Sequence, residues 1–203
     1  MIAPALENCW RDGTGLVLIG YRGTGKSTVG RIVAERTQAP FADADTVLEH
    51  AAGQSIRSIF EAEGEDGFRR REAAILLHLT AASPELTGGI LSTGGGAILR
   101  EPNRRAFRQF GLVVWLTADP DTLARRLARS QHAAADRPPL TAAGTLEEVA
   151  TVLAARTPIY REAADVEVVS AGRSVHEVAD SVIEAWYRAL LERRGQRWKE
   201  ANR

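Results

Sequence analysis

Residues 20–27 read Gly-Tyr-Arg-Gly-Thr-Gly-Lys-Ser, which fits G-x-x-x-x-G-K-[ST], the pattern of a phosphate-binding loop. Glycines let the backbone curl so that successive N–H groups face one anion, and the N-terminus of a following helix adds partial positive charge. We expect Lys26 to reach the β- and γ-phosphates of a nucleotide and the Ser27 hydroxyl to bind Mg²⁺. The other predicted nucleotide-binding positions of the loop are Gly23, Thr24, Gly25 and Thr28.

Two carboxylates, Asp43 and Asp45, follow the short segment 40–42, which is a candidate strand. Residues two apart on an extended chain share a face, so both can point into the crevice at the carboxyl end of a sheet, where ligands bind. One could hold Mg²⁺ through water, and the other could accept a hydrogen bond from a substrate hydroxyl. The alternative is a helix N-cap at Asp45, before residues 46–49.

Three consecutive glycines, Gly94, Gly95 and Gly96, follow the apolar residues of a third candidate strand. Glycines there allow a ligand to approach the backbone closely, although a simple turn is the alternative. Ser92 and Thr93, immediately before them, could join the water shell of a bound Mg²⁺.

Arginines on helical segments are usually solvated, but two of them, and a third arginine in an irregular stretch, could bind anions. Arg69 can pair with Glu72 three residues later, which would orient its guanidinium. If Arg69 and Arg156 face one cleft, they suit a carboxylate substrate through bidentate contacts. Arg137 lies in an irregular, proline-containing stretch and could move onto a transferring phosphoryl group.

The candidate strands alternate with helical patterns, which predicts an α/β sandwich with a mainly parallel sheet. We expect helices to start after Asp119 and at capping boxes beginning at Thr145 and Ser174. The predicted strands are residues 16–19, 40–43, 90–92, 112–116 and 166–169. The predicted organisation is a flexible lead-in (1–14), one domain (15–190) with a helical insertion (46–80) and a lid (129–144), and a charged tail (191–203).

The composition is that of an ordinary globular protein, with 203 residues of which 44% are hydrophobic. Because 26 basic residues balance 26 acidic ones, the chain lacks the charge excess of a nucleic-acid or membrane binder. Cys9 is the single cysteine, which excludes an intrachain disulfide. We therefore expect a cytoplasmic monomer whose partner is a small molecule.

The ordered set of motifs resembles the shikimate kinase family, over roughly residues 15–187. This resemblance implies a fold like that of the nucleoside monophosphate kinases, with a five-stranded parallel sheet of order 2-3-1-4-5. It also implies transfer of the γ-phosphate of ATP to the 3-hydroxyl of shikimate, with Mg²⁺. The motifs are the phosphate-binding loop, Asp43-Ala-Asp45, Ser58-Ile-Phe60, Gly64-Glu65, Phe68-Arg69, the three glycines, Arg137-Pro138 and Arg156-x-Pro158-x-Tyr160.

The resemblance implies roles for single residues. Asp43 belongs to the water shell of the metal, whereas Asp45 binds the shikimate hydroxyls and accepts the proton. Arg69 and Arg156 grip the shikimate carboxylate, in a pocket lined by the three glycines with Phe60 and Phe68 as apolar walls. Arg126 packs on adenine, and Arg137 acts on the phosphates from the lid, which here reads Arg-Pro-Pro-Leu rather than the usual Arg-Pro-Leu-Leu.

Two alternatives stay open at the level of sequence. A related small-molecule kinase such as gluconate kinase shares the loop and the fold, but is not expected to keep all the motifs together. A regulatory ATP-binding module without turnover is the alternative of a different class. A GTPase is disfavoured because the chain has no Asn-Lys-x-Asp, and a dinucleotide-binding fold because Lys-Ser-Thr follows Gly25.

Overall fold

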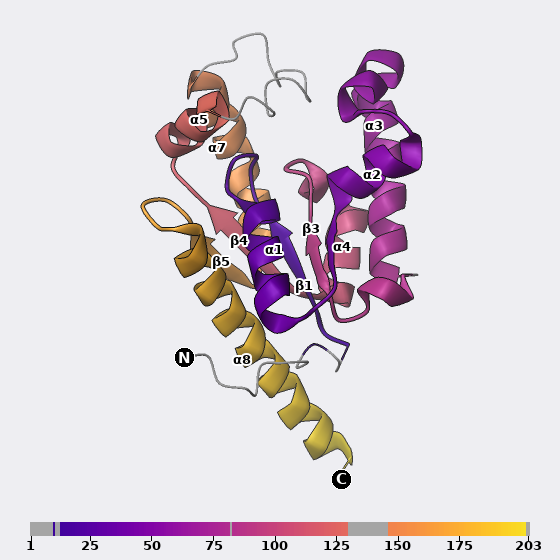
Figure 1. Ribbon diagram of the computed structural model, residues 1–203, viewed down its shortest axis with the longest axis vertical. Helices are drawn as coiled ribbons and strands as arrows, with labels where there is room; N and C mark the ends of the chain where they lie inside the picture. Colours follow the sequence, from indigo (N-terminus) through magenta and orange to yellow (C-terminus); the bar gives the residue numbers. More distant parts are fainter. Residues whose placement is uncertain (1–9, 11–12, 82, 130–145, 202–203) are drawn as a thin grey trace.

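A five-stranded parallel sheet forms the centre of the computed structural model, which describes residues 10, 13–81, 83–129 and 146–201 (Figure 1). The strand order is β2-β3-β1-β4-β5, and every neighbouring pair is parallel, which confirms the predicted order. Each strand begins and ends within one residue of its prediction. The strands are β1 (Gly15–Ile19), β2 (Phe41–Asp43), β3 (Ile90–Ser92), β4 (Gly111–Thr117) and β5 (Val166–Val169).

Helices cover both faces of the sheet, so the molecule is the predicted α/β sandwich and has three layers (Figure 1). Helices α1 (Lys26–Thr37) and α8 (Val175–Ala201) pack on one face. Helices α3 (Ile56–Ala81), α4 (Glu101–Phe110) and α7 (Leu146–Ala163) pack on the other. A parallel strand buried on both faces has apolar residues throughout, which explains the continuous run that precedes the phosphate-binding loop.

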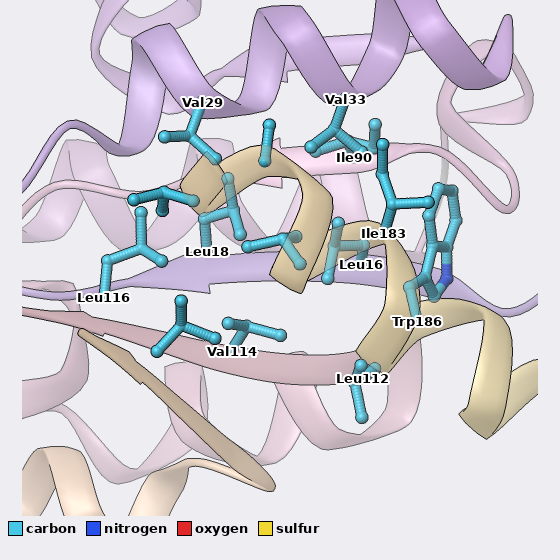
Figure 2. Close-up of a cluster of buried hydrophobic side chains, with 14 of the residues drawn as sticks. Leu16, Leu18, Val29, Val33, Ile90, Leu112, Val114, Leu116, Ile183 and Trp186 are labelled. Carbon is cyan, nitrogen blue, oxygen red and sulfur yellow. The ribbon is translucent and has the colours of Figure 1, made fainter. Parts of the chain in front are cut away.

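Alternate residues of β1 divide between the two cores. Leu16 and Leu18 join the cluster under α1 and α8, whereas Val17 and Ile19 join the cluster on the opposite face. Figure 2 shows the first cluster, where Val29 and Val33 of α1 descend toward these leucines. The side chains of β1 are fully buried, and this packing fixes the position of the strand end from which the phosphate-binding loop begins.

The last helix is longer than the sequence suggested. α8 continues to Ala201, so most of the predicted charged tail (191–203) belongs to this helix, and residues 191–195 and Lys199 are exposed. The buried indole of Trp186 donates a hydrogen bond from Nε1 to the carbonyl oxygen of Thr14 at 3.1 Å. The lead-in is thereby joined to the domain at Thr14, while residues 1–9 and 11–12 lie outside the described residues.

The segment between β2 and β3 is helical, as predicted for residues 46–80. It consists of α2 (Ala44–Ala52) and α3, which is interrupted at Gly64, where φ is 66°. Leu48, Ile59 and Phe68 belong to a small apolar cluster within this segment. Two short 3₁₀ helices follow in the chain, η3 (Pro84–Leu86) and η4 (Ala97–Leu99). The insertion therefore has its own packing and stands beside the carboxyl end of the sheet (Figure 1).

Two of the predicted helix starts are confirmed by their hydrogen bonds. Helix α5 (Pro120–Arg129) begins after Asp119, whose Oδ1 accepts from the backbone N–H of Thr122 at 2.7 Å. Ser174 and Glu177 form the reciprocal capping box at the start of α8. The third cap, at Thr145, and residues 130–144 of the predicted lid lie outside the described residues, and Arg137 lies there too.

None of the helices in the described ranges is long and apolar enough to cross a membrane.

Candidate active site

The phosphate-binding loop connects β1 to α1 and takes its shape from glycines. Gly23 and Gly25 have φ values of 82° and 95°, a backbone region that glycine enters without steric cost. Lys26 is 7% exposed, and its Nζ donates to the carbonyl oxygens of Gly20 at 2.8 Å and Tyr21 at 2.9 Å. The ammonium group is thus held against the first two residues of the loop.

The two threonines predicted to bind the nucleotide differ in their burial. Thr24 is buried, and its hydroxyl donates to the carbonyl oxygen of Tyr21 at 2.8 Å, which braces the loop from inside. Thr28 is exposed in the first turn of α1.

Three oxygen-bearing side chains lie where α1, β2 and β3 approach one another. The hydroxyls of Ser27 and Ser92 are 3.4 Å apart, and Asp43 pairs with Ser92 in the strand register. Hydroxyl and carboxylate oxygens suit Mg²⁺, which keeps several waters and uses few protein ligands. Within the described ranges no group of three or more His, Cys, Asp and Glu could form a closed metal cage. The donor set fits the hydrated Mg²⁺ that accompanies a nucleotide.

The geometry of the two aspartates differs from the prediction. β2 ends at Asp43, and Asp45 lies in the first turn of α2, so the pair does not share one extended face. The helix cap is Asp43 rather than Asp45, because Asp43 Oδ1 accepts from the backbone N–H groups of Asp45 and Thr46 at 3.1 and 3.5 Å. Asp43 is thus both the last residue of β2 and the cap of α2, so the chain turns into the helix before it reaches Asp45.

Gly94 separates two carboxylates that come from different helices. A Cβ built on Gly94 would collide with Oε1 of Glu72 from α3 and would lie 3.2 Å from Oδ1 of Asp45 from α2. Any side chain at this position would displace these oxygens. The glycine therefore allows Asp45 to approach the turn after β3, and its contact with a substrate hydroxyl stays a prediction.

Gly96 plays the same part for Arg69. A Cβ on Gly96 would overlap the guanidinium of Arg69, which lies flat against the turn. Arg69 is oriented by Glu72, whose Oε2 is 2.7 Å from Nη1, and more loosely by Glu65 at 3.3 Å. Since the Glu72 side chain is 2% exposed, this buried carboxylate fixes the orientation of the Arg69 guanidinium.

The middle glycine joins the turn to α7. The carbonyl oxygen of Gly95 accepts from Nη1 of Arg156 at 3.4 Å and from the hydroxyl of Tyr160. Arg69 and Arg156 thus approach neighbouring residues of one turn, Gly96 and Gly95, and their joint grip on a carboxylate stays a prediction. Tyr160 is fully buried, and this burial raises the pKa of its phenol.

We expect Tyr160→Phe to lower the free energy of unfolding by about 1 kcal/mol, because it removes one hydrogen bond to the Gly95 carbonyl. It should also flatten the alkaline limb of the stability curve. The native pKa of Tyr160 is raised, so its contribution is fully present below the unfolded pKa of about 10 and is lost as pH rises through the native value. Denaturant unfolding between about pH 8 and 11 checks this, with Tyr187→Phe as control. Equal slopes for Tyr160→Phe and wild type would contradict the assignment.

Arg126 connects the phosphate-binding loop to the residues after β5. Its Nη1 donates to the carbonyl oxygen of Gly23 at 3.2 Å, and its Nη2 to the carbonyl oxygen of Ser170 at 2.8 Å. The guanidinium plane is therefore fixed at the rim of the loop, where a flat surface can support a nucleotide base. Stacking on adenine stays a prediction.

The two phenylalanines contact each other in the insertion. The Phe60 and Phe68 ring centroids are 4.6 Å apart, and the guanidinium carbon of Arg69 is 5.1 Å from the Phe68 ring. Phe68 is 3% exposed and belongs to the core of the insertion, whereas Phe60 is partly exposed. Their role as walls of a substrate pocket stays a prediction.

Sequence reasoning did not place Tyr160, Arg22 or Glu148 among the site residues. Tyr160 was visible only as part of a motif, and nothing local indicated that it reaches Gly95. Glu148 is the fourth residue of the capping box predicted to begin at Thr145, yet its side chain is 1% exposed and lies 3.6 Å from Nη2 of Arg22. A carboxylate in the first turn of a helix gives no signal of burial, so only the fold reveals this ion pair.

A phosphate-binding loop on a β2-β3-β1-β4-β5 sheet, with an acidic side chain and an arginine pair beside it, defines a P-loop kinase that acts on a small molecule. The family model described as shikimate kinase matches residues 22–187. This chain therefore belongs to the shikimate kinase family.

Relatives and solved structures agree with this assignment. A shikimate kinase of Symbiobacterium thermophilum is 42% identical over 182 residues, which cover 90% of this chain and 98% of the relative. The structure of Acinetobacter baumannii shikimate kinase in complex with shikimate superposes with a TM-score of 0.77 at 34% identity, covering 85% of this chain and 92% of that one. A gluconokinase from Sinorhizobium meliloti, at 19% identity and a TM-score of 0.54 over 91% of this chain and 97% of that one, shares the fold alone.

Proposed function

We propose that this chain transfers the γ-phosphate of ATP to the 3-hydroxyl of shikimate, giving shikimate 3-phosphate and ADP. The observation that carries the proposal is the convergence of Asp45, Arg69 and Arg156 on the three-glycine turn, next to the phosphate-binding loop. A carboxylate that can accept a proton and two cations that can hold an acid match a hydroxylated carboxylic acid. Family membership supports the same acceptor.

On the nucleotide side, the chain supplies positive charge and backbone donors. Lys26 and the N–H groups of residues 23–28 would bind the phosphates, and the Lys26 ammonium would exchange its two carbonyl partners for phosphate oxygens. Ser27 would bind Mg²⁺ directly, and Asp43 would bind it through water, with Ser92 beside them. When bound, Mg²⁺ neutralises charge on the phosphates.

On the acceptor side, Arg69 and Arg156 would fix the carboxylate, and Asp45 would take the proton of the attacking hydroxyl. The oxygen–phosphorus bond to the acceptor forms as the bond between the γ-phosphorus and the β–γ bridging oxygen breaks. Holding both partners in line supplies much of the rate enhancement in such transfers. Arg126 at the adenine, Arg137 at the phosphates and a lid over residues 129–144 complete the proposal, as do a cytoplasmic location and a monomeric state.

The experiment that tests the function is ADP release by the purified protein with Mg²⁺–ATP, with shikimate, gluconate or no acceptor. We expect turnover that depends on shikimate. Turnover with gluconate alone would keep the phosphate site and overturn the assignment of Asp45, Arg69 and Arg156. ATP binding without turnover on either acceptor would favour the regulatory module.

Arg69→Ala and Arg156→Ala should each weaken shikimate binding by about 2–5 kcal/mol, because one partner of a desolvated charge pair is removed. The KM for shikimate should therefore rise, whereas the KM for ATP should stay near that of the wild type. Arg57→Ala is a matched control, since Arg57 lies on the same helix as Arg69 but is 58% exposed and paired with Glu61. An unchanged KM for shikimate in both variants would contradict the carboxylate clamp.

A further inference from the structure

Arg22 and Glu148 form an ion pair between two elements that are distant in the sequence. Arg22 is the third residue of the phosphate-binding loop, and Glu148 lies in the first turn of α7. The distance between Nη2 and Oε1 is 3.6 Å, and the exposed fractions of the two side chains are 21% and 1%. The guanidinium carbon also lies 5.9 Å from the centre of the Tyr21 ring.

The burial of Glu148 calls for a reason, because a carboxylate removed from water is costly unless a positive group is near. The N-terminus of α7 supplies part of that charge. A glutamine can take the same position in a capping box, but it would gain less from the helix N-terminus, which favours a negative charge. What distinguishes glutamate from glutamine is its charge, and the guanidinium of Arg22 lies 3.6 Å from its carboxylate.

The ion pair adds to other contacts that join the phosphate-binding loop, the three-glycine turn and α7. The backbone nitrogen of Arg22 lies against Gly95, at 3.2 Å from a Cβ built on that glycine. The carbonyl of Gly95 in turn accepts hydrogen bonds from Arg156 and Tyr160 of α7. Loop, turn and helix therefore meet at Gly95, and the ion pair joins loop and helix a second time, two turns before Arg156.

We propose that Arg22 and Glu148 are positioning residues, which hold the acceptor-binding helix α7 at a fixed place relative to the phosphate-binding loop. This inference rests on the proposed function, because it uses Arg156 as an acceptor ligand. Transfer between two bound substrates depends on their relative alignment, and a displacement of about 1 Å can cost about 10²-fold in rate. The brace acts on alignment and leaves each separate binding surface intact.

The test is a double-mutant cycle with Arg22→Met, Glu148→Gln and the double variant, followed by ADP release at saturating substrates. We expect each single change to lower kcat by about 10–100-fold, and the double change to cost no more than either. Binary dissociation constants for ADP and for shikimate should stay within about threefold of wild type. Arg22→Lys, which keeps the charge, should restore part of the rate.

The outcomes separate this proposal from its rivals. Independent, additive losses or an unchanged kcat would overturn it. A loss in Arg22→Met without a loss in Glu148→Gln would mean that Arg22 acts on a substrate directly. A lowered melting temperature with normal kcat would leave only a structural role. Arg188→Met and Glu184→Gln, which remove an exposed pair of α8 at 2.9 Å, serve as matched controls.

A second measurement needs no acceptor and so stands even if shikimate is not the substrate. The brace predicts that ADP slows amide hydrogen exchange in residues 146–163 of the wild type and of Arg22→Lys. The same protection should be lost in Arg22→Met and in Glu148→Gln. Equal protection in all four proteins would overturn the proposal, whatever the assay of turnover gives.

Discussion

Replacing Lys26 with alanine is expected to abolish turnover, with kcat falling by at least about 10³-fold, the scale of cationic contacts in phosphoryl transfer. The physical reason is that charge spreads over the γ-phosphate oxygens as the group is transferred. Lys26 is 7% exposed, so its ammonium acts where water screens it little. In the structure it is already aimed across the loop by the carbonyls of Gly20 and Tyr21.

The chain provides an unusually clean control for this prediction. Lys199 is its only other lysine. It lies exposed near the end of α8, so Lys199→Ala should leave both kcat and KM unchanged. Because Lys26 donates two hydrogen bonds within the loop, the melting temperature of Lys26→Ala should be compared with that of the wild type. A near-normal kcat in a folded Lys26→Ala protein would refute its role at the phosphates.

Asp45→Asn should lower kcat by about 10²–10⁴-fold, the usual contribution of a general base. The amide keeps an oxygen that can accept a hydrogen bond from the shikimate hydroxyl, but it cannot take the proton. KM for shikimate should therefore change far less than kcat. The measurement is steady-state ADP release, with Asp66→Asn as control, since Asp66 lies exposed in the same insertion.

The second carboxylate at Gly94 makes this prediction sharper. Oε1 of Glu72 approaches the same glycine as Oδ1 of Asp45, so either could be supposed to take the proton. Glu72, however, is ion-paired with Arg69 at 2.7 Å, which holds it in the role of orienting the clamp. A large loss of kcat in Glu72→Gln with little loss in Asp45→Asn would assign the base to Glu72 and leave Asp45 as a positioning group.

The phosphate-binding loop could be predicted from sequence because its chemistry is local. Eight consecutive residues contain the turn-forming glycines, the lysine and the serine, and a buried strand and a helix on either side fix their direction. The strand pattern was equally readable, since parallel strands buried on both faces are apolar throughout. The order of the strands came from resemblance to a family, because no local pattern specifies which strands become neighbours.

The aspartates show where local reasoning fails. Alternation along an extended chain predicted one shared face, but Asp43 caps α2 and ends the strand before Asp45. Both residues reach the carboxyl end of the sheet, by a different geometry from the one predicted. Asp43 is both the last residue of β2 and the cap of α2, so the backbone is no longer extended at Asp45.

The nucleotide loop, the alternation of strands and helices, and the residue types suited to a phosphorylated or carboxylated ligand all follow from the sequence. Which of these residues meet depends on the tertiary structure. Gly94 lies between Asp45 and Glu72, Gly95 joins Arg156 and Tyr160, and Arg22 of the phosphate-binding loop pairs with Glu148 of α7. Such contacts join residues tens of positions apart, and they arise because the hydrophobic cores on the two faces of the sheet fix where each helix lies.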